Sequence, residues 1–320
     1  MSERARIGIL DDYQGVALEL ADWTAVRERA DISRFRDHLA EGAALIERLQ
    51  PFEVLCVMRE RTPLRRATLE RLPNLKLICS TAPRNASIDM AAAEALGIKV
   101  AHTGYFSTPT VELTFALMLE SLRHVGREHA ALAAGGWQQT VGEDLARKTL
   151  GIIGLGHIGS AVAKVALAFG MRVIAWSQNL DDKRAAAAGA QLVTKDQLLA
   201  ESDIVTLHLV LSARTAKMIG ARELALMKPS ARLINTSRGP LVEESALIDA
   251  LNAGRIAGAA IDVYDIEPLP QEHPYRHLPN LLSTPHIGYV TRDLYERFYG
   301  DTVRNVLEYL KARPARRNPS

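Results

Sequence analysis

The chain has 320 residues, enough for about two domains with buried cores. Apolar residues make up 48% and charged residues 24%, which excludes a collagen-like, low-complexity or largely disordered chain. The 39 basic residues are balanced by 37 acidic ones, so the chain lacks the strong positive field of a dedicated nucleic-acid binder. We therefore expect a small-molecule partner and no nucleic acid.

Short apolar runs alternate with helical patterns along the first hundred residues. Strands are expected at 6–10, 54–58, 75–80 and 99–101, and helical spacing over 88–96 ends at Gly97. This alternation is typical of a parallel sheet. A long amphipathic helix is then predicted over 111–125, with a loop around Gly135 and Gly136.

A second alternating series follows. It predicts strands at 149–153, 172–176, 203–209, 232–236 and 259–263, with helices between them and a final helix over about 293–311. Five strands with short crossovers are enough for a second doubly wound sheet. The fold class is therefore α/β, with two doubly wound parallel-sheet domains of Rossmann-like type.

The cysteines and histidines give no sign of a metal site or a disulfide framework. Cys56 and Cys79 lie inside apolar runs without a CxxC partner, and they resemble small core residues of strands. His273 and His277 are four residues apart, but in a proline-bounded stretch that need not be helical. We expect no metal. With no apolar targeting region at the N-terminus and no run of membrane-span length, we expect a cytoplasmic protein without membrane association.

A glycine-rich motif lies between a predicted strand and a predicted helix. Gly154 permits a tight turn, Gly156 lets the backbone approach a pyrophosphate, and Gly159 allows the helix to pack closely on the strand. The amides of His157 and Ile158 would point at phosphate from the helix N-terminus. The motif therefore predicts a dinucleotide site.

The next strand does not end in the carboxylate that is typical of an NAD-specific site. It ends at Ser177, followed by neutral amides. Asp181 and Asp182 come a few residues later, where helix capping explains them equally well, and Lys183 and Arg184 follow. The cofactor is NAD or NADP, and the missing carboxylate slightly favours tolerance of NADP.

Two polar segments, at 235–240 and 262–268, follow predicted strands, and the segment at 283–289 supplies a third polar group. Loops at the carboxyl ends of parallel strands converge on one ligand crevice. Arg238 can bind a carboxylate with two hydrogen bonds, His286 can exchange a proton near neutral pH, and Glu267 beside it would favour the charged imidazole. Taken singly, Arg238 could merely cap its loop and Glu267 could be a turn residue. Together they suit the transfer of a hydride and a proton on a 2-keto or 2-hydroxy acid.

Four segments in order, 154–159, 235–239, 262–268 and 284–288, resemble the D-isomer-specific 2-hydroxyacid dehydrogenase family, and the similarity runs from about Leu75 to the C-terminus. The resemblance implies that Arg238 holds the substrate carboxylate and carbonyl. It implies that His286 is the general acid/base and that Glu267 pairs with it to raise its pKa. Glyoxylate and hydroxypyruvate are the candidate substrates.

The resemblance also implies a set of cofactor contacts. Asp262 would bond the nicotinamide carboxamide, and the backbone of 236–238 would line the nicotinamide pocket. The full expected cofactor set is Gly154, Gly156, His157, Ile158, Gly159, Ser177, Thr236, Ser237, Arg238, Asp262, His286 and Gly288.

In this family the substrate domain is discontinuous. The resemblance therefore implies a substrate-binding domain of 1–101 plus 288–320, a dinucleotide-binding Rossmann domain of 102–287, and a cleft between them. It also implies a homodimer formed through the cofactor domain. Some relatives are dinucleotide-sensing corepressor scaffolds, so a binding role is the alternative; it would predict a damaged catalytic trio or long extra tails, and this sequence has neither.

The expected substrate loop departs from the family pattern. The loop contains Ala82, Pro83, Arg84 and Asn85, where the family usually has glycine near position 82. Proline brings no amide proton. We expect fewer backbone donors to face the substrate, with side chains of Arg84 or Asn85 contributing instead.

Overall fold

A computed structural model describes residues 4–313 of the chain. The chain divides into two compact units. Unit 1 comprises the residues up to Phe106 together with those from Thr291 onward, and unit 2 runs from Ser107 to Val290. Across the described residues, no helix is both long enough and apolar enough to cross a membrane.

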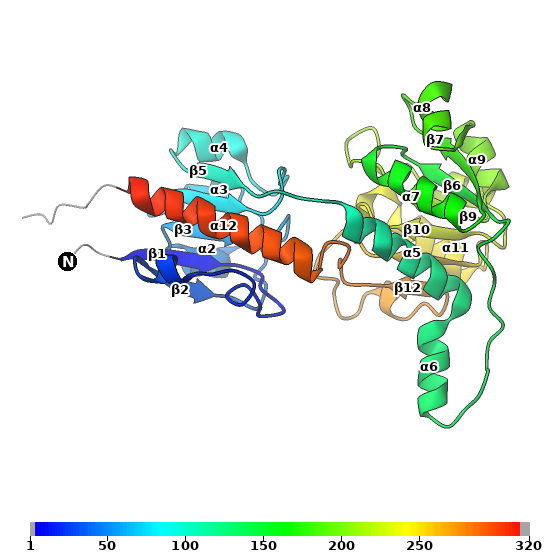
Figure 1. Cartoon of the computed structure of the whole chain (residues 1–320), viewed down its shortest axis with the longest axis horizontal. Coiled ribbons are helices and arrows are strands. Elements are labelled where there is room, and N and C mark those ends of the chain that lie inside the picture. The colour runs from blue at the N-terminus through cyan, green and yellow to red at the C-terminus, as the bar shows by residue number, and fades with distance from the viewer. Residues whose placement is uncertain (1–3, 314–320) are drawn as a thin grey trace, which may run out of the picture. The chain divides into compact units, whose positions relative to one another are not determined.

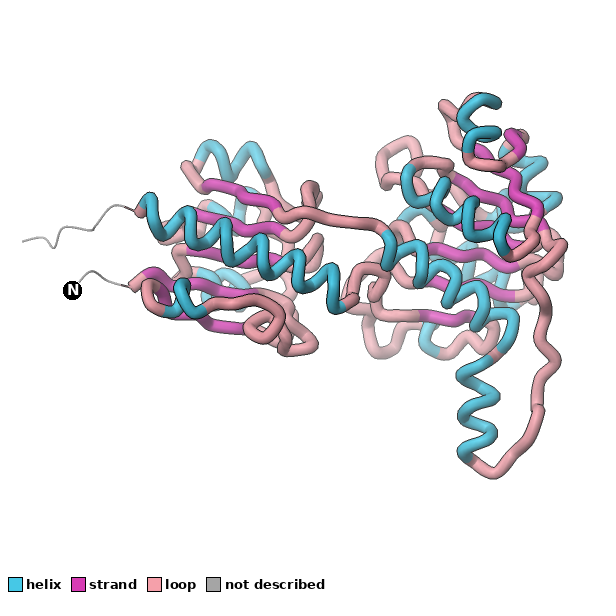
Figure 2. Tube along the Cα trace, viewed as in Figure 1, coloured by secondary structure: helices cyan, strands magenta, loops and turns pink. Residues whose placement is uncertain are grey.

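Unit 1 is built on a five-stranded parallel sheet in the order β2-β1-β3-β4-β5 (Figure 2). Its strands are β1 (Ala5–Ile9), β2 (Ala30–Arg34), β3 (Val54–Val57), β4 (Leu77–Ser80) and β5 (Lys99–His102). Its helices are α1 (Thr24–Arg27), α2 (Ala43–Leu49), α3 (Arg66–Leu69), α4 (Met90–Ala95) and α12 (Arg292–Ala312).

The two faces of the unit 1 sheet are covered by helices from different parts of the sequence. The core against α2, α3 and α4 contains Leu45, Leu69 and Ile78. The long helix α12 crosses the opposite side and contacts β4, β5 and α1 (Figure 1). The C-terminal helix thus completes a unit that begins at the N-terminus.

Unit 2 is built on a seven-stranded parallel sheet in the order β12-β11-β10-β9-β6-β7-β8. Its strands are β6 (Thr149–Ile153), β7 (Arg172–Trp176), β8 (Gln191–Leu192), β9 (Ile204–Leu207), β10 (Arg232–Asn235), β11 (Gly258–Ile261) and β12 (Leu281–Ser283). The order reverses at β6, where the doubly wound fold binds ligands outside the strand ends.

Alternate residues of each unit 2 strand enter one of two cores. On one side α9 (Lys195–Glu201), α10 (Ala221–Leu226) and α11 (Glu244–Asn252) cover a core that includes Val205 and Leu233. On the other side α5 (Thr108–Arg123), α7 (His157–Ala168) and α8 (Asp182–Ala187) cover a core that includes Ile152 and Ile234. Two short 3₁₀ turns, η1 (Gly239–Leu241) and η2 (Pro274–Arg276), lie in the connections.

The expected single helix over 111–125 is two helices. Helix α5 ends at Arg123, His124 adopts a left-handed φ of 54°, and α6 (Val125–Ala133) continues in a new direction. No proline marks this break, and the nearest glycine, Gly126, lies inside α6, which is why the periodic pattern missed it. No residue of α6 is buried, and the helix projects from unit 2 with the loop that follows it (Figure 1).

Candidate active site

The three polar segments at 235–240, 262–268 and 283–289 lie side by side in unit 2. They follow β10, β11 and β12, which are neighbours in the sheet and run parallel. Their carboxyl ends therefore meet at one edge, and the loops bearing Arg238, Glu267 and His286 leave the sheet there.

His286 and Glu267 form a short hydrogen bond. Nδ1 of His286 lies 2.5 Å from Oε2 of Glu267, and both side chains are partly accessible. His286 has a left-handed φ of 53°, a conformation that non-glycine residues seldom adopt and that is often found at functional sites. The bond directs Nδ1–H toward the carboxylate, so Nε2 is the ring nitrogen that does not face Glu267.

Glu267 is held from its other side as well. Its Oε1 accepts a hydrogen bond from the backbone N–H of Tyr264 at 3.0 Å. Burial raises the pKa of Glu267, but the hydrogen bond and charge of His286, the Tyr264 N–H and the charge of Arg238 outweigh burial, so this pKa is lowered. Glu267 is therefore a carboxylate at neutral pH.

Asp262, fully buried after β11, anchors the loop that carries His286. Its Oδ1 accepts from the Thr284 hydroxyl at 2.6 Å and the Ile287 N–H at 2.8 Å, and its Oδ2 accepts from the Gly288 N–H at 2.8 Å. Burial raises the pKa of Asp262, against the opposing effect of these donors and of His286. The carboxylate thus binds residues on both sides of His286.

The loop of Arg238 packs directly on the backbone beyond β11. A Cβ atom on Gly239 would lie 2.1 Å from the carbonyl carbon of Tyr264, so only glycine allows this approach. Arg238 is half-buried, and its Nη1 donates to the Ser237 carbonyl at 2.7 Å. The side chain of Asn235 ties the loop into a turn by donating to the Arg238 carbonyl and accepting from the Ser237 N–H.

Two tyrosines, Tyr264 and Tyr289, contact the loop that carries His286. The Tyr264 hydroxyl donates to the Thr284 carbonyl at 2.8 Å, and burial raises the pKa of Tyr264 to about 12. The ring of Tyr289 meets that of His286 edge-on at 5.3 Å. In the sequence, Tyr264 lies in the 262–268 segment and Tyr289 is the last residue of the 283–289 segment.

The glycine motif fits a dinucleotide. A Cβ atom on Gly159 would lie 2.1 Å from the Gly154 carbonyl oxygen, so the first turn of α7 packs tightly on the end of β6. At Gly156 a Cβ atom would meet nothing within 4 Å. The space beside Gly156 is therefore open to a pyrophosphate, in front of the N–H groups of His157 and Ile158 in the first turn of α7.

Beside this motif lies an open groove of about 670 Å³ between α7 and α8. Ser177, at the end of β7, accepts a hydrogen bond from the Leu155 N–H at 3.1 Å and so contacts the glycine motif. Arg184 lines the groove, and its Nη1 donates to the Asn179 carbonyl at 3.2 Å. Its other polar lining residues are His157, Ser160 and Lys164.

In unit 1, the expected substrate loop follows β4. Ala82 has a left-handed φ of 66°, and its N–H donates to the Thr103 hydroxyl at 2.8 Å. The Asn85 amide donates to the Arg59 carbonyl and to the Ser80 hydroxyl, and its oxygen accepts from the Ser87 N–H. These groups are thus used within the fold, whereas the Arg84 side chain is exposed.

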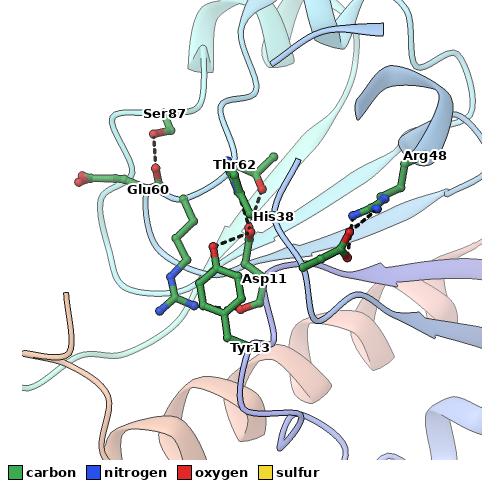
Figure 3. Close-up of polar contacts among 9 residues, drawn as sticks. Asp11, Tyr13, His38, Arg48, Glu60, Thr62 and Ser87 are labelled. Carbon is green, nitrogen blue, oxygen red and sulfur yellow. Dashed lines mark hydrogen bonds and ion pairs between the residues drawn. The ribbon is translucent and has the colours of Figure 1, made fainter. Parts of the chain in front are cut away.

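The neighbouring strand ends of unit 1 hold a polar cluster (Figure 3). The buried Asp11 carboxylate, after β1, accepts from the Thr62 hydroxyl at 2.5 Å and lies 3.0 Å from Nδ1 of His38. Arg61 donates to the Asp11 carbonyl at 2.9 Å and stacks over the Tyr13 ring at 4.4 Å. The cluster fixes the loops after β1 and β3 beside the expected substrate loop.

The two histidines that are four residues apart, His273 and His277, lie at the two ends of η2. His273 Nε2 lies 3.2 Å from Glu244, and its Nδ1 accepts from the Tyr275 N–H. Across residues 4–313, no group of three or more histidine, cysteine or acidic side chains is arranged to hold a metal ion.

A doubly wound sheet with this glycine motif and a hydrogen-bonded histidine–glutamate pair at its edge is typical of a dinucleotide-dependent oxidoreductase. Residues 115–288 match the family model for the NAD binding domain of D-isomer specific 2-hydroxyacid dehydrogenases. The chain is 40% identical over 253 residues to a glyoxylate reductase of Thermococcus litoralis, covering 76% of each chain. It is 31% identical to a hydroxypyruvate reductase of Blautia hydrogenotrophica, covering 97% of this chain and 98% of the relative.

A solved structure of a phosphoglycerate oxidoreductase from Vibrio cholerae superposes with a TM-score of 0.91 at 36% identity, covering 97% of this chain and all of that one. The chain therefore belongs to the D-isomer specific 2-hydroxyacid dehydrogenase family. It is an oxidoreductase that uses a nicotinamide cofactor on 2-keto and 2-hydroxy acids, and the corepressor alternative is not favoured.

Proposed function

We propose that this protein reduces a small 2-keto acid, with glyoxylate and hydroxypyruvate as candidate substrates, and that Arg238, Glu267 and His286 perform the reaction. The observation that carries the proposal is the 2.5 Å bond between His286 and Glu267, in a loop network that also holds Arg238. The names of the two reductase relatives support the choice of substrates.

Each of the three side chains has a separate task. The bound nicotinamide cofactor supplies the hydride in reduction. His286 gives a proton from Nε2 to the substrate carbonyl oxygen, because Nδ1 is engaged by Glu267. Glu267 stabilises the imidazolium before the transfer. Arg238 binds the substrate carboxylate through its planar guanidinium, which matches a carboxylate with two parallel bonds.

Unit 1 supplies the remaining substrate contacts in this proposal. Ala82, Pro83, Arg84 and Asn85 form the loop, yet the Ala82 N–H is bonded to Thr103 and proline has no N–H. Because the Asn85 amide is also used within the fold, Arg84 is the side chain of this loop that would contact the substrate, in addition to the carboxylate contact of Arg238.

The cofactor preference leans toward acceptance of NADPH. Ser177 places a hydroxyl where a carboxylate would repel a 2′-phosphate, and it contacts the glycine motif at Leu155. The groove beside the motif is lined by the basic side chains of Arg184 and Lys164 and by His157. A phosphate entering this groove would gain charge-assisted hydrogen bonds.

The protein is proposed to act as a homodimer formed through unit 2. Helix α6 and the loop behind it expose Val125, Leu132, Trp137 and Val141, with Trp137 76% and Val141 96% exposed. Glu128 fastens the loop to α6 by accepting from Thr140 and Gln139, so the apolar side chains sit on an ordered arm. A second copy of the chain would cover them.

A cytoplasmic location is also proposed. Cys56 and Cys79 are buried free thiols that face each other in the register of β3 and β4. Thiols at such neighbouring positions stay reduced in a reducing compartment.

The purified protein should be assayed with NADH and NADPH against glyoxylate, hydroxypyruvate, pyruvate and longer 2-keto acids. We expect turnover of the two-carbon and three-carbon acids, with kcat/KM falling as the chain lengthens. Tight dinucleotide binding without turnover of any of these acids would contradict the proposal and favour a binding role.

A further inference from the structure

Helix α5 carries two hydroxyl groups on its buried face. Thr110 is 8% exposed and Thr114 is fully buried, between the apolar residues Val111, Phe115 and Met118. A hydroxyl buried at such a position is unfavourable unless it is hydrogen-bonded. Neither threonine belongs to a motif that the sequence singled out.

Both hydroxyls reach loops of the active site. The Thr110 hydroxyl donates to the carbonyl of Gly288 at 3.0 Å, and Gly288 comes two residues after His286. The Thr114 hydroxyl lies 3.0 Å from that of Thr236, two residues before Arg238. The helix also contacts β10 and β11, the strands from which the Arg238 and Glu267 loops leave.

The hydrogen bonds can be assigned by counting protons. Thr114 donates its single hydroxyl proton to the Thr110 carbonyl, one turn earlier, at 2.8 Å. Thr236 is then the donor in the bond between the two threonine hydroxyls, because a hydroxyl has one proton and two lone pairs. A series of hydrogen bonds therefore links both loops through one turn of α5, from Thr236 to Thr114, Thr110 and Gly288.

We propose that Thr110 and Thr114 are positioning residues that set the distance between the loops bearing Arg238 and His286. This inference rests on the proposed function, because one 2-keto acid must bind Arg238 and receive a proton from His286 at the same time. A displacement of about 1 Å between such groups can cost about 100-fold in rate. The Gly288 N–H donates to Asp262 and the Gly288 carbonyl accepts from Thr110, so both backbone polar groups of this residue are fixed.

Valine in place of threonine keeps the branched shape and removes the hydroxyl. For Thr110→Val and Thr114→Val we expect kcat to fall about 10-fold or more, while the Kd of the dinucleotide changes less than about threefold. Thr110→Ser and Thr114→Ser restore the hydroxyl and should recover most of the rate. Ser121→Ala is the matched control, because the Ser121 hydroxyl donates to the Met118 carbonyl within the same helix.

Hydrogen exchange of the two loops gives a readout that does not depend on turnover. In the valine variants the backbone amides of 235–239 and 284–290 should exchange faster than in the wild type, and the serine variants should restore protection. The positioning role would be overturned by two results together, given a wild type that turns over keto acids. The valine variants would show unchanged exchange, and their kcat would lie within twofold of the wild-type value. If the wild type turns over no keto acid while the exchange pattern is as expected, the proposed function fails and the structural link stands.

Discussion

Nδ1 of His286 lies 2.5 Å from Oε2 of Glu267, and Oε1 of the same carboxylate accepts the Tyr264 N–H. Both oxygens of Glu267 are thus occupied by donors from two directions, and the imidazole ring is held with Nε2 turned away from the carboxylate. A ring so held, beside a negative charge, is suited to carry a proton to a substrate oxygen and to take one back.

Replacement of Glu267 by Gln should lower kcat for keto-acid reduction about 10-fold or more, because the amide cannot stabilise the imidazolium. In the proposed mechanism the protonated form of His286 is the active one in reduction, so the pH at which reductive activity is half-lost should move to lower pH. The pH profile of kcat measures this. Glu272→Gln, at an exposed position in the same connection, is the control; an unmoved profile in Glu267→Gln would exclude the charge of Glu267 from the reaction.

Arg238→Lys keeps the positive charge but loses the planar pair of donors. The variant should chiefly raise KM for the keto acid, about 10-fold or more, since the carboxylate contact is made before and during the reaction. Steady-state kinetics at saturating cofactor provide the test, with the exposed Arg255→Lys as control. A change confined to dinucleotide affinity would show that Arg238 does not bind the carboxylate.

Introducing Asp at position 177 should weaken NADPH binding selectively. The new carboxylate would meet a 2′-phosphate of like charge, whereas it can still accept bonds from an unmodified ribose. Fluorescence titration of wild type and Ser177→Asp with both reduced cofactors gives the two ratios of Kd. Equal changes for NADH and NADPH would mean that position 177 does not face the ribose.

Asp203, directly before β9, bonds the first residue of β6. Its carboxylate should make the free energy of unfolding depend on pH. Its carboxylate accepts from the Lys228 ammonium and from the Thr149 N–H, each at 2.8 Å. Burial raises the pKa of Asp203, but these two partners outweigh it and the pKa is lowered. A lowered pKa gives stability that is present above the unfolded value, about 3.9, and is lost as the pH falls through the folded value.

Asp203→Asn should therefore reduce the free energy of unfolding by about 1 kcal/mol at pH 7 and by less at pH 3. Denaturant unfolding at the two pH values measures the difference. An equal loss at both would mean that the charge of Asp203 is not what stabilises the fold.

The central strands and the loops that follow them could be predicted because their signals are local. The strands at 149–153 and 172–176 have the expected bounds, because the apolar residues that fill most of each are buried on both faces of the sheet. Strands β2, β8 and β12 were missed. Each lies at an edge of its sheet, and β2 and β12 have mostly exposed or half-buried side chains, so they lack the apolar run on which the prediction depends.

The supporting residues of the site could not be predicted, because their partners are distant in the sequence. Thr110 bonds a residue 178 positions away, and Thr114 one 122 positions away. The expected contact of Asn85 with the substrate would need its side-chain amide. That amide is hydrogen-bonded to Arg59, Ser80 and Ser87 within the fold. Such pairings follow from the packing of loops and helices and have no periodic signal.

The claim that His286 carries the proton is tested most directly by His286→Asn. We predict that kcat for reduction of the best keto acid falls by a factor on the order of 10² to 10⁴ while the Kd of the reduced cofactor stays within about threefold of the wild-type value. Single-turnover rates and cofactor titration on the same preparation give both numbers. A kcat equal to that of the wild type would remove His286 from the mechanism.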